Sequence, residues 1–596
     1  MPDNAIIDSA AHQHEAAWPV TFTGNPGLFK PAKGQARNVA VLFLSPWGID
    51  ELSTRRFFRI VAEQLSEIGI ASLRFDYPGT VNAMEHPDED IDVETWCRAA
   101  IHGAAALRQL SGAQHAVLFG FGLGGAIALK VSRDIHNLTG LALLAPVVAG
   151  RRYLRELSLW STMIDEGVGV PPHLRDTAPG TIAGLTMPRG IIDTLDTLNP
   201  KLLPDTSVSC IFLARRPDNN ADQQLRDQLV TSGADVRDFE FSGYDRMVQN
   251  PHGQRFPDRL IPGFLDWMRD LPATNTPIET QLHNLSLPQA LTSGTIRETA
   301  VRMGVNLIGT LCEPIANATD VTVVLLSTAY DHQAGWGRSS VELARRLAEK
   351  GIVSLRFDSA GVGDSPPVSD RRIEVLYDET QIADIAIART FLETIGRTGP
   401  ALLYGRCSGA YVAFRAAAED QRWAGCIAIN PYIFRWHGTP PENIARSAPR
   451  PLADYSRKAF RLQTVSRLLK GDIDVGAAVR HIRVRVGQRM SNLLAPILGP
   501  LMPSERLNRA VHSDVAMLSQ RQGKTCIVYS AGDPGLDNMH VHFGEDGRKL
   551  ANYANVELHI LPDTDHNVTP RVSREMLYAI VERTALALTT ERTRDQ

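Results

Sequence analysis

The chain has 596 residues, 43% of them hydrophobic and 21% charged, which is enough apolar material for sizeable buried cores and excludes a disordered composition. Its net charge of -4 gives no overall basic field, so we expect nucleic acid not to be the main partner. At roughly 100–200 residues per domain, the length predicts more than one domain.

The N-terminal stretch MPDNAIIDSAAHQHEAAWPV lacks the basic and apolar regions of a signal peptide. No segment approaches the ~18 uninterrupted apolar residues of a membrane span. We therefore expect a cytoplasmic protein without a membrane span. Its six cysteines lie far apart and form no CxxC pair, which favours reduced thiols and argues against a bound metal.

An internal repeat appears when the chain is followed from its N-terminus. The apolar run VLFLSP, starting at Val41, corresponds to VVLLST, starting at Val323. In both places an amphipathic helical pattern follows (FFRIVAEQLSEIGI and SSVELARRLAEKGI), and then the identical segment SLRFD. These segments begin at Ser72 and Ser354, 282 positions apart, so the first three matches keep one spacing.

The correspondence continues through two further blocks. AVLFGFGLGGAIAL at Ala116 matches ALLYGRCSGAYVAF at Ala401, and LALLAP matches CIAINP, both at an offset of 285. The last match pairs FEFSGYDR, ending at Arg246, with LHILPDTDH, ending at His566, at an offset of 320. The difference of 35 indicates an insertion of that length in the second half.

Short β-branched runs alternate with helical periods in both halves, which is typical of βαβ units. The predicted fold class is therefore α/β, with two domains that each contain a mostly parallel sheet flanked by helices. We place the first domain at 18–271, a polar linker at 272–295 and the second domain at 296–590.

A glycine-flanked turn stands between an apolar strand pattern and a helix of small residues in ALLYGRCSGAYVAF. Gly405 and Gly409 flank Cys407 in the pattern G-x-nucleophile-x-G. On this motif and on the repeat, the sequence resembles the α/β-hydrolase superfamily over most of both halves. Within it, the halves are similar in style to serine aminopeptidase-like hydrolases and to hydrolases associated with bacterial exosortase loci. A cysteine nucleophile is found in a minority of members, such as dienelactone hydrolases, polyhydroxyalkanoate synthases and some thioesterases.

The resemblance implies that the thiolate of Cys407 attacks an acyl carbon. A helix N-terminus and a neighbouring histidine would lower the pKa of its thiol. Ser408 is the rival nucleophile, but the glycine frame centres on Cys407. In this family the residue after the nucleophile normally gives its backbone N–H to the oxyanion hole, which is the role we expect for Ser408. A buried cysteine in an inactive site is the alternative interpretation.

The family's order of nucleophile, acid and histidine is also present. Asp533 follows the strand pattern TCIVYSAGD, and His566 lies in LHILPDTDHN after the next strand. Asp533 would orient the imidazole of His566, which would accept and return the proton. Asp537 is a weaker candidate for the acid. We expect His540 and His542 to be surface or lid residues.

The second oxyanion donor should follow the strand at 321–327. Backbone N–H groups of Thr328, Ala329 and Tyr330 are available there, and we take Ala329 as the candidate without excluding the others. The later segment DSAGVGDS, from Asp358 to Ser365, resembles a structural turn of the family, and we expect no chemistry from it.

The corresponding positions in the first half lack these side chains. Gly122 stands at the nucleophile position, Arg246 at the histidine position, and Pro217 or Asp218 at the acid position. The first domain is therefore predicted to be a pseudo-enzyme that supports the second site or binds a partner. Its GFGLGG run does not open a first βαβ unit, so a dinucleotide site is not expected.

The family's variable helical lid would occupy about 432–519. Many basic side chains and few acids fall in it: Arg457, Lys458, Arg461, Arg467, Lys470, Arg480, Arg483, Arg485 and Arg489. They could receive an anionic carrier such as coenzyme A, an acyl carrier protein or an acidic glycan, or form a solvated helix face.

Together these features predict an esterase, thioesterase or acyltransferase that acts on a small-molecule acyl substrate without a cofactor. The alternative is a non-catalytic two-domain scaffold.

Overall fold

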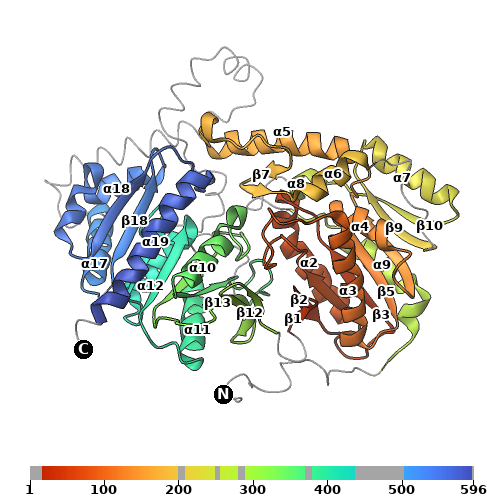
Figure 1. The fold of residues 1–596 in the computed structure, drawn as a ribbon, viewed down its shortest axis with the longest axis horizontal. Coiled ribbons are helices and arrows are strands. Elements are labelled where there is room, and N and C mark those ends of the chain that lie inside the picture. Colours follow the sequence, from red (N-terminus) through yellow and green to blue (C-terminus); the bar gives the residue numbers. More distant parts are fainter. Residues whose placement is uncertain are drawn as a thin grey trace, which may run out of the picture.

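The structure is a computed structural model that describes residues 16–198, 208–248, 255–278, 289–368, 377, 379–436, 503–521 and 523–592. Within these ranges the chain forms two large sheets, one in each half, joined through 255–278 and 289–295 (Figure 1). The predicted α/β class is thus confirmed.

The N-terminal sheet is parallel from β4 to β10, and β1 and β2 form an antiparallel edge. Its order is β1 (Trp18–Phe22), β2 (Asn25–Lys30), β4 (Ala71–Phe75), β3 (Val39–Leu44), β5 (His115–Phe121), β6 (Leu138–Leu144), β9 (Cys210–Arg215) and β10 (Asp235–Glu240). Every residue of β3, VAVLFL, is buried, as expected for a strand whose sheet is covered on both faces.

Two sets of helices cover the faces of this sheet. The helices are α2 (Ile49–Glu67), α3 (Val93–Ser111), α4 (Leu123–Val131), α5 (Gly150–Val168), α6 (Arg189–Thr197), α7 (Asn220–Thr231), α8 (Tyr244–Val248) and α9 (Leu260–Asp270). One buried cluster joins the sheet to α3, α4 and α7, and a second joins its other face to α2, α8 and α9. A short hairpin, β7 (Thr181–Ile182) and β8 (Leu185–Thr186), lies between α5 and α6 in the chain.

The C-terminal sheet repeats this order and has one additional antiparallel strand at its edge. The order is β11 (Leu291–Ser293), β12 (Ile296–Met303), β13 (Leu307–Pro314), β15 (Val353–Phe357), β14 (Thr322–Leu326), β16 (Ala401–Arg406), β17 (Gly425–Ile429), β18 (Thr525–Ser530) and β19 (Val556–Leu561). β11 falls within 272–295, the range that sequence analysis assigns to a linker. Its three residues pair with β12, so the end of this range belongs to the sheet.

The C-terminal helices also form two layers. α10 (Ser339–Glu349) and α19 (Arg571–Arg592) pack on one face. α11 (Gln381–Thr394), α12 (Ser408–Glu419), α17 (Pro503–Ser519) and α18 (Gly535–Phe543) pack on the other. α17 and Tyr432 to Trp436 lie in the predicted lid range, and the basic side chains from Arg457 to Arg489 lie outside the described residues.

The antiparallel ends of the two sheets meet at the centre of the molecule, where β1 approaches β12 (Figure 1). Arg302 of β12 places its guanidinium over the Trp18 ring of β1, 4.4 Å from the centroid. A cation is attracted to the face of an indole ring, so this pair contributes to the contact between the domains.

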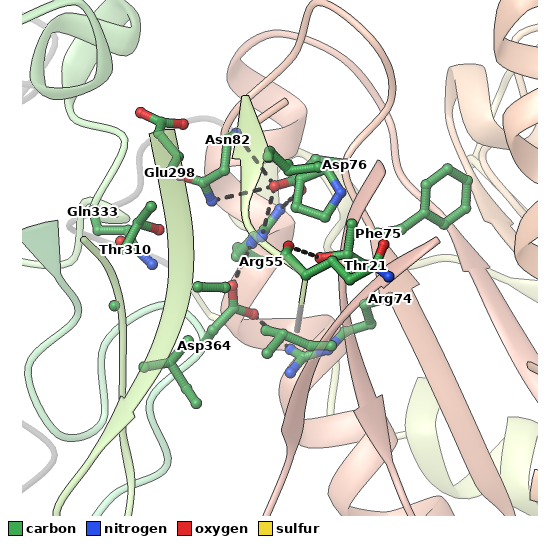
Figure 2. A pocket seen from close by; sticks show the side chains of 18 residues that line it. Thr21, Arg55, Arg74, Phe75, Asp76, Asn82, Glu298, Thr310, Gln333 and Asp364 are labelled. Carbon is green, nitrogen blue, oxygen red and sulfur yellow. Dashed lines mark hydrogen bonds and ion pairs between the residues drawn. The ribbon is translucent and has the colours of Figure 1, made fainter. Parts of the chain in front are cut away.

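A buried ionic cluster also spans the domain boundary (Figure 2). Arg55 of α2 is bound to Asp76 of its own domain, and its Nε lies 2.9 Å from Oδ2 of Asp364 in the other. Arg74 of β4 lies 2.9 Å from the second oxygen of Asp364. Asp364 belongs to the DSAGVGDS turn, for which no chemistry is expected from the sequence. In this structure the turn links the domains.

Two arginines of the C-terminal domain bind a backbone loop of the N-terminal domain. The Arg338 guanidinium donates to the carbonyls of Gly79, Val81 and Ala83 at 3.1, 3.0 and 2.8 Å. Arg345 donates to the same Ala83 carbonyl at 2.8 Å. Charge-assisted hydrogen bonds of this kind are stronger than neutral ones and fix orientation, so these contacts help to hold the two domains together. None of the helices in the described ranges is long and apolar enough to cross a membrane.

Candidate active site

The predicted nucleophile elbow lies between β16 and α12. Cys407 has φ 54° and ψ -116°, a left-handed conformation that a residue with a side chain rarely adopts. The flanking glycines are required by close packing: a Cβ at Gly409 would come within 2.7 Å of the Ser327 carbonyl, and one at Gly405 would collide with Gly409. The turn raises the partly exposed Cys407 side chain at the carboxyl end of the sheet, where the helix N-terminus begins.

The predicted acid and base meet at the same edge of the sheet. Asp533 follows β18 and His566 follows β19, and His566 Nδ1 lies 2.6 Å from Asp533 Oδ2. The other oxygen of Asp533 accepts the Gly535 N–H at 2.8 Å, which fixes the carboxylate. This arrangement leaves Nε2 as the imidazole nitrogen that can exchange a proton with a neighbour.

The electrostatics of Cys407 and His566 are coupled. Burial raises the pKa of the Cys407 thiol. The charge and hydrogen bond of His566 and the charge of Arg406 lower it by more than burial raises it, so the pKa lies below its ordinary value. Burial lowers the pKa of His566, but Cys407 and Asp533 raise it well above the usual range. The two shifts favour a thiolate beside an imidazolium, the reactive form of a cysteine nucleophile.

The two candidate oxyanion residues are neighbours. The Ala329 N–H donates to Oγ of Ser408 at 2.8 Å, and the Ser408 N–H hydrogen-bonds to the Cys407 side chain. Ala329 has φ 48°, in the left-handed region. Of the alternatives, Thr328 donates its hydroxyl to the Arg406 carbonyl at 3.0 Å.

The remaining candidates lie away from this centre. Asp537 and His540 are exposed on α18. His542 is buried, and its Nδ1 lies 3.0 Å from Oδ1 of Asn508 in α17, within the predicted lid range. Burial lowers the pKa of His542 to about 4, so it is neutral near pH 7. These contacts give His542 a packing role.

Asn430, which was not recognised from the sequence, orders the loop that carries His566. Asn430, directly after β17, donates to Oγ of Ser530 at 2.9 Å and to the His566 carbonyl at 2.8 Å, while its oxygen accepts the Ser530 N–H at 2.7 Å. A buried side-chain amide with these partners connects three loops at the edge of the sheet. The sequence offers one signal, an asparagine at the end of the CIAINP block, where asparagine readily adopts its observed φ of 49°.

Tyr377 is a second residue that sequence analysis missed. Its side chain hydrogen-bonds with Cys407, and its ring stacks on Trp436 with centroids 5.8 Å apart and planes 7° apart. Burial and the nearby sulfur raise the pKa of the Tyr377 phenol well above its ordinary value, so it stays protonated and can donate. No motif in the sequence marks this position.

Two groups of side chains in the described ranges could approach a metal ion. His332, Asp358 and Asp364 form one, but Asp364 is already bound by Arg55 and Arg74 at the domain boundary. Cys526, Glu557 and His559 form the other, in which Glu557 is paired with Lys524. Asp364 and Glu557 are thus each paired with a protein cation.

The corresponding elbow in the N-terminal domain has the same backbone conformation and a glycine at the position of Cys407. Gly122, between β5 and α4, has φ 54° and ψ -117°, nearly the same values as Cys407. Asp218 and Asp245 line a cavity beside it, whereas Arg246, the predicted counterpart of the histidine, is exposed and is not among the lining residues.

Comparison with known proteins agrees with this geometry. Residues 323–575 match the model of the alpha/beta hydrolase family. None of the curated proteins matches the chain.

Similar solved structures each span about half of the chain. A putative lipase from Acinetobacter baumannii is 15% identical and covers 50% of this chain and 93% of its own, with a TM-score of 0.30. A dienelactone hydrolase from Anabaena variabilis is 12% identical and covers 49% and 99%, with a TM-score of 0.31. An alpha-beta serine hydrolase homologue from Coxiella burnetii is 14% identical and covers 48% and 95%, with a TM-score of 0.27.

Proposed function

We propose that the C-terminal domain is an alpha/beta hydrolase that processes an ester or thioester through Cys407, His566 and Asp533. The observation that carries this proposal is the 2.6 Å contact from His566 to Asp533, together with the lowered pKa of the Cys407 thiol beside that imidazole. A positioned base and an activated thiolate in one site are the requirements of covalent acyl catalysis.

The first half of the reaction forms an acyl-enzyme. The Cys407 thiolate adds to the acyl carbon, and the carbonyl oxygen gains a negative charge near the backbone N–H groups of Ser408 and Ala329. The bond to the leaving group then breaks, and His566 gives its proton to the departing alkoxide or thiolate. The product is a thioester on Cys407.

The second half releases the acyl group. Neutral His566 takes a proton from water or from an acceptor alcohol or thiol, which attacks the thioester carbon. Collapse of the tetrahedral intermediate returns the thiolate to Cys407 and gives an acid or a transferred acyl group. Asp533 orients the imidazole and stabilises the imidazolium.

Under this proposal the N-terminal domain is a pseudo-enzyme that supports the catalytic domain. Gly122 supplies no nucleophile, and the hairpin β7–β8 packs near the catalytic loop, where a Cβ on Gly184 would lie 3.5 Å from Cγ2 of Thr569. A small-molecule acyl group carried on coenzyme A, an acyl carrier protein or a glycan remains our proposal for the substrate.

Intact-mass analysis after incubation with p-nitrophenyl esters and short acyl thioesters tests the proposal. We expect an acyl adduct in the unmodified protein and in Cys210→Ser, the control that removes a half-buried thiol of the other domain. The adduct should be absent from Cys407→Ala. In Ser408→Ala an adduct should still form, because the proposed sulfur remains. Loss of the adduct in Ser408→Ala but not in Cys407→Ala would make serine the nucleophile, and no adduct or turnover in any protein would favour a binding scaffold.

A further inference from the structure

The N-terminal domain contains a cavity of about 480 Å³ beside Gly122. Its wall comes from the loop after β3, from α5, from the loop after β9 and from α8. The elbow conformation of Gly122 places this cavity where the C-terminal domain has its nucleophile. The absence of a side chain at Gly122 therefore leaves room for a ligand where a catalytic group would otherwise stand.

Four aromatic side chains contribute to the cavity wall. Trp47, Tyr153, Trp160 and Tyr244 line it, from three separate elements. The Arg216 guanidinium already lies over the Tyr244 ring, 5.6 Å from its centroid, so the other three rings are the ones that could receive a ligand. Trp47 is buried, whereas the other three are partly buried. Aromatic faces carry negative potential, so several rings around one volume favour a cation that can also make apolar contacts.

Acidic side chains outnumber basic ones among the residues that line the cavity. Four acids (Asp50, Glu156, Asp218 and Asp245) and two bases (Arg152 and Arg216) line it. Both bases are paired: Arg152 lies 2.7 Å from Glu156, and Arg216 binds Asp222 through Nε at 3.0 Å and NH2 at 2.7 Å. The cavity therefore has no uncommitted cation among its lining residues.

Asp50 is the acid best placed to receive a ligand. Among the described residues its carboxyl group has no hydrogen-bond or ion-pair partner, and its Oδ2 would lie 3.8 Å from a Cβ on Gly122. Burial raises the pKa of Asp50 to about 7, although the charge of Arg216 opposes this. A carboxyl group in this state gains stabilisation when a cation enters beside it.

From the aromatic wall, the paired arginines and the unpartnered Asp50, we infer that the N-terminal domain binds a small organic cation of the alkylammonium class in this cavity. The rings would contact the alkyl groups and the Asp50 carboxylate would balance the charge. This inference does not depend on acyl chemistry at Cys407, and it gives the domain without a nucleophile a ligand of its own.

The binding should depend on pH through Asp50. The groups that face it are Tyr153, Glu156 and Arg152 from α5, Arg216 and Asp218 after β9, and Tyr244 and Asp245 at α8. Burial and the Asp50 charge raise the pKa of both tyrosines, so they stay neutral. A bound cation favours the ionised carboxylate. The affinity for a permanent cation should therefore decrease as the pH is lowered below 7, and the decrease should approach about tenfold for each pH unit.

Isothermal titration calorimetry on the full chain can test this with choline and 3,3-dimethylbutan-1-ol, its uncharged isostere. We expect choline to bind at least about tenfold more tightly than the alcohol, with proton release near pH 6 that is revealed by buffers of different ionisation heat. Asp50→Asn should weaken choline binding by about tenfold or more. Asp193→Asn, which changes an exposed acid on α6 outside the cavity, should leave it unchanged.

A second pair of variants tests the aromatic wall on one helix. Trp160→Ala should weaken choline binding, whereas Leu159→Ala, which changes a side chain 65% exposed to solvent, should not. Thermal denaturation checks that each variant is folded. Cys407→Ala should bind choline like the unmodified protein, so loss of the acyl adduct and loss of this site are separate results. Equal affinity for choline and the alcohol, retained binding in Asp50→Asn, or no choline binding at millimolar concentration would overturn the inference.

Discussion

The two elbows of this chain have almost the same backbone but different side chains. Gly122 and Cys407 have φ and ψ within about a degree of one another. The next loop behaves likewise, since Ala145 (φ 44°) and Asn430 (φ 49°) both adopt the left-handed region. The elbow therefore belongs to the architecture of the sheet, and its conformation persists where no nucleophile stands on it.

The surroundings of the elbows differ more than the elbows themselves. Cys407 lies between Arg406, which donates to Asn567 in the loop of His566, and Ser408, whose hydroxyl accepts the Ala329 N–H. Gly122 lies between Phe121 and Leu123, both buried in apolar clusters. Placing a cysteine at position 122 would therefore not by itself reproduce the surroundings of Cys407.

Exchanging the two elbow residues should produce the largest effect. Cys407→Gly should abolish the acyl adduct and reduce turnover by about 10³-fold or more, because removing a nucleophile removes the covalent pathway. Gly122→Cys should gain no adduct. Its thiol would lie near Asp50 without an imidazole, so its pKa would not be lowered. Mass analysis of both variants measures this, and an adduct on residue 122 would contradict the comparison.

The domain boundary offers a second contrast, with smaller expected effects. Position 364 carries the aspartate that binds Arg55 and Arg74, while the equivalent position in the N-terminal domain is Asn82, which donates to Asp76 at 3.2 Å. Asp364→Asn should reduce the free energy of unfolding by about 3–5 kcal/mol, because two buried cations lose a partner. Urea denaturation measures the loss. Asp563→Asn, an exposed control on the loop after β19, should change it by less than about 0.5 kcal/mol.

The smallest expected effect is a shift in the pH dependence of Cys407 alkylation. The Cys407 thiolate is favoured at a pH below the ordinary thiol pKa of about 8.5, so its alkylation by iodoacetamide should reach half its maximal rate below that pH. The sign follows from His566: its positive charge lowers the thiol pKa, and His566→Ala should move the midpoint upward by about one unit or more. An unchanged midpoint would mean that the imidazole does not activate the thiol.

Much of the fold was available from the sequence. The repeat at 282 positions and the fully apolar strand patterns predicted two α/β domains, and the structure confirms two sheets of matching order. Local chemistry was enough because buried parallel strands require continuous apolar runs and an elbow requires glycines at both flanks. Cys407, Asp533 and His566 could also be named from their order in the chain, and their catalytic roles stay predictions.

Other features depended on contacts between distant segments. Asn430 and Tyr377 were not recognised because neither has a motif, and each acquires its role from residues far away in the chain. The same holds for Asp364, which the sequence presents only as part of a turn.

The sequence by itself determined the two α/β domains, the glycine-framed elbows and the order of the candidate triad, since each follows from local periodicity or from residues a few positions apart. Only the tertiary structure decided that Asp364 joins the domains and that Asp50 faces an aromatic cavity beside Gly122. Charges and cavities arise from side chains that folding brings together, and spacing along the chain does not encode which of them will remain without a partner.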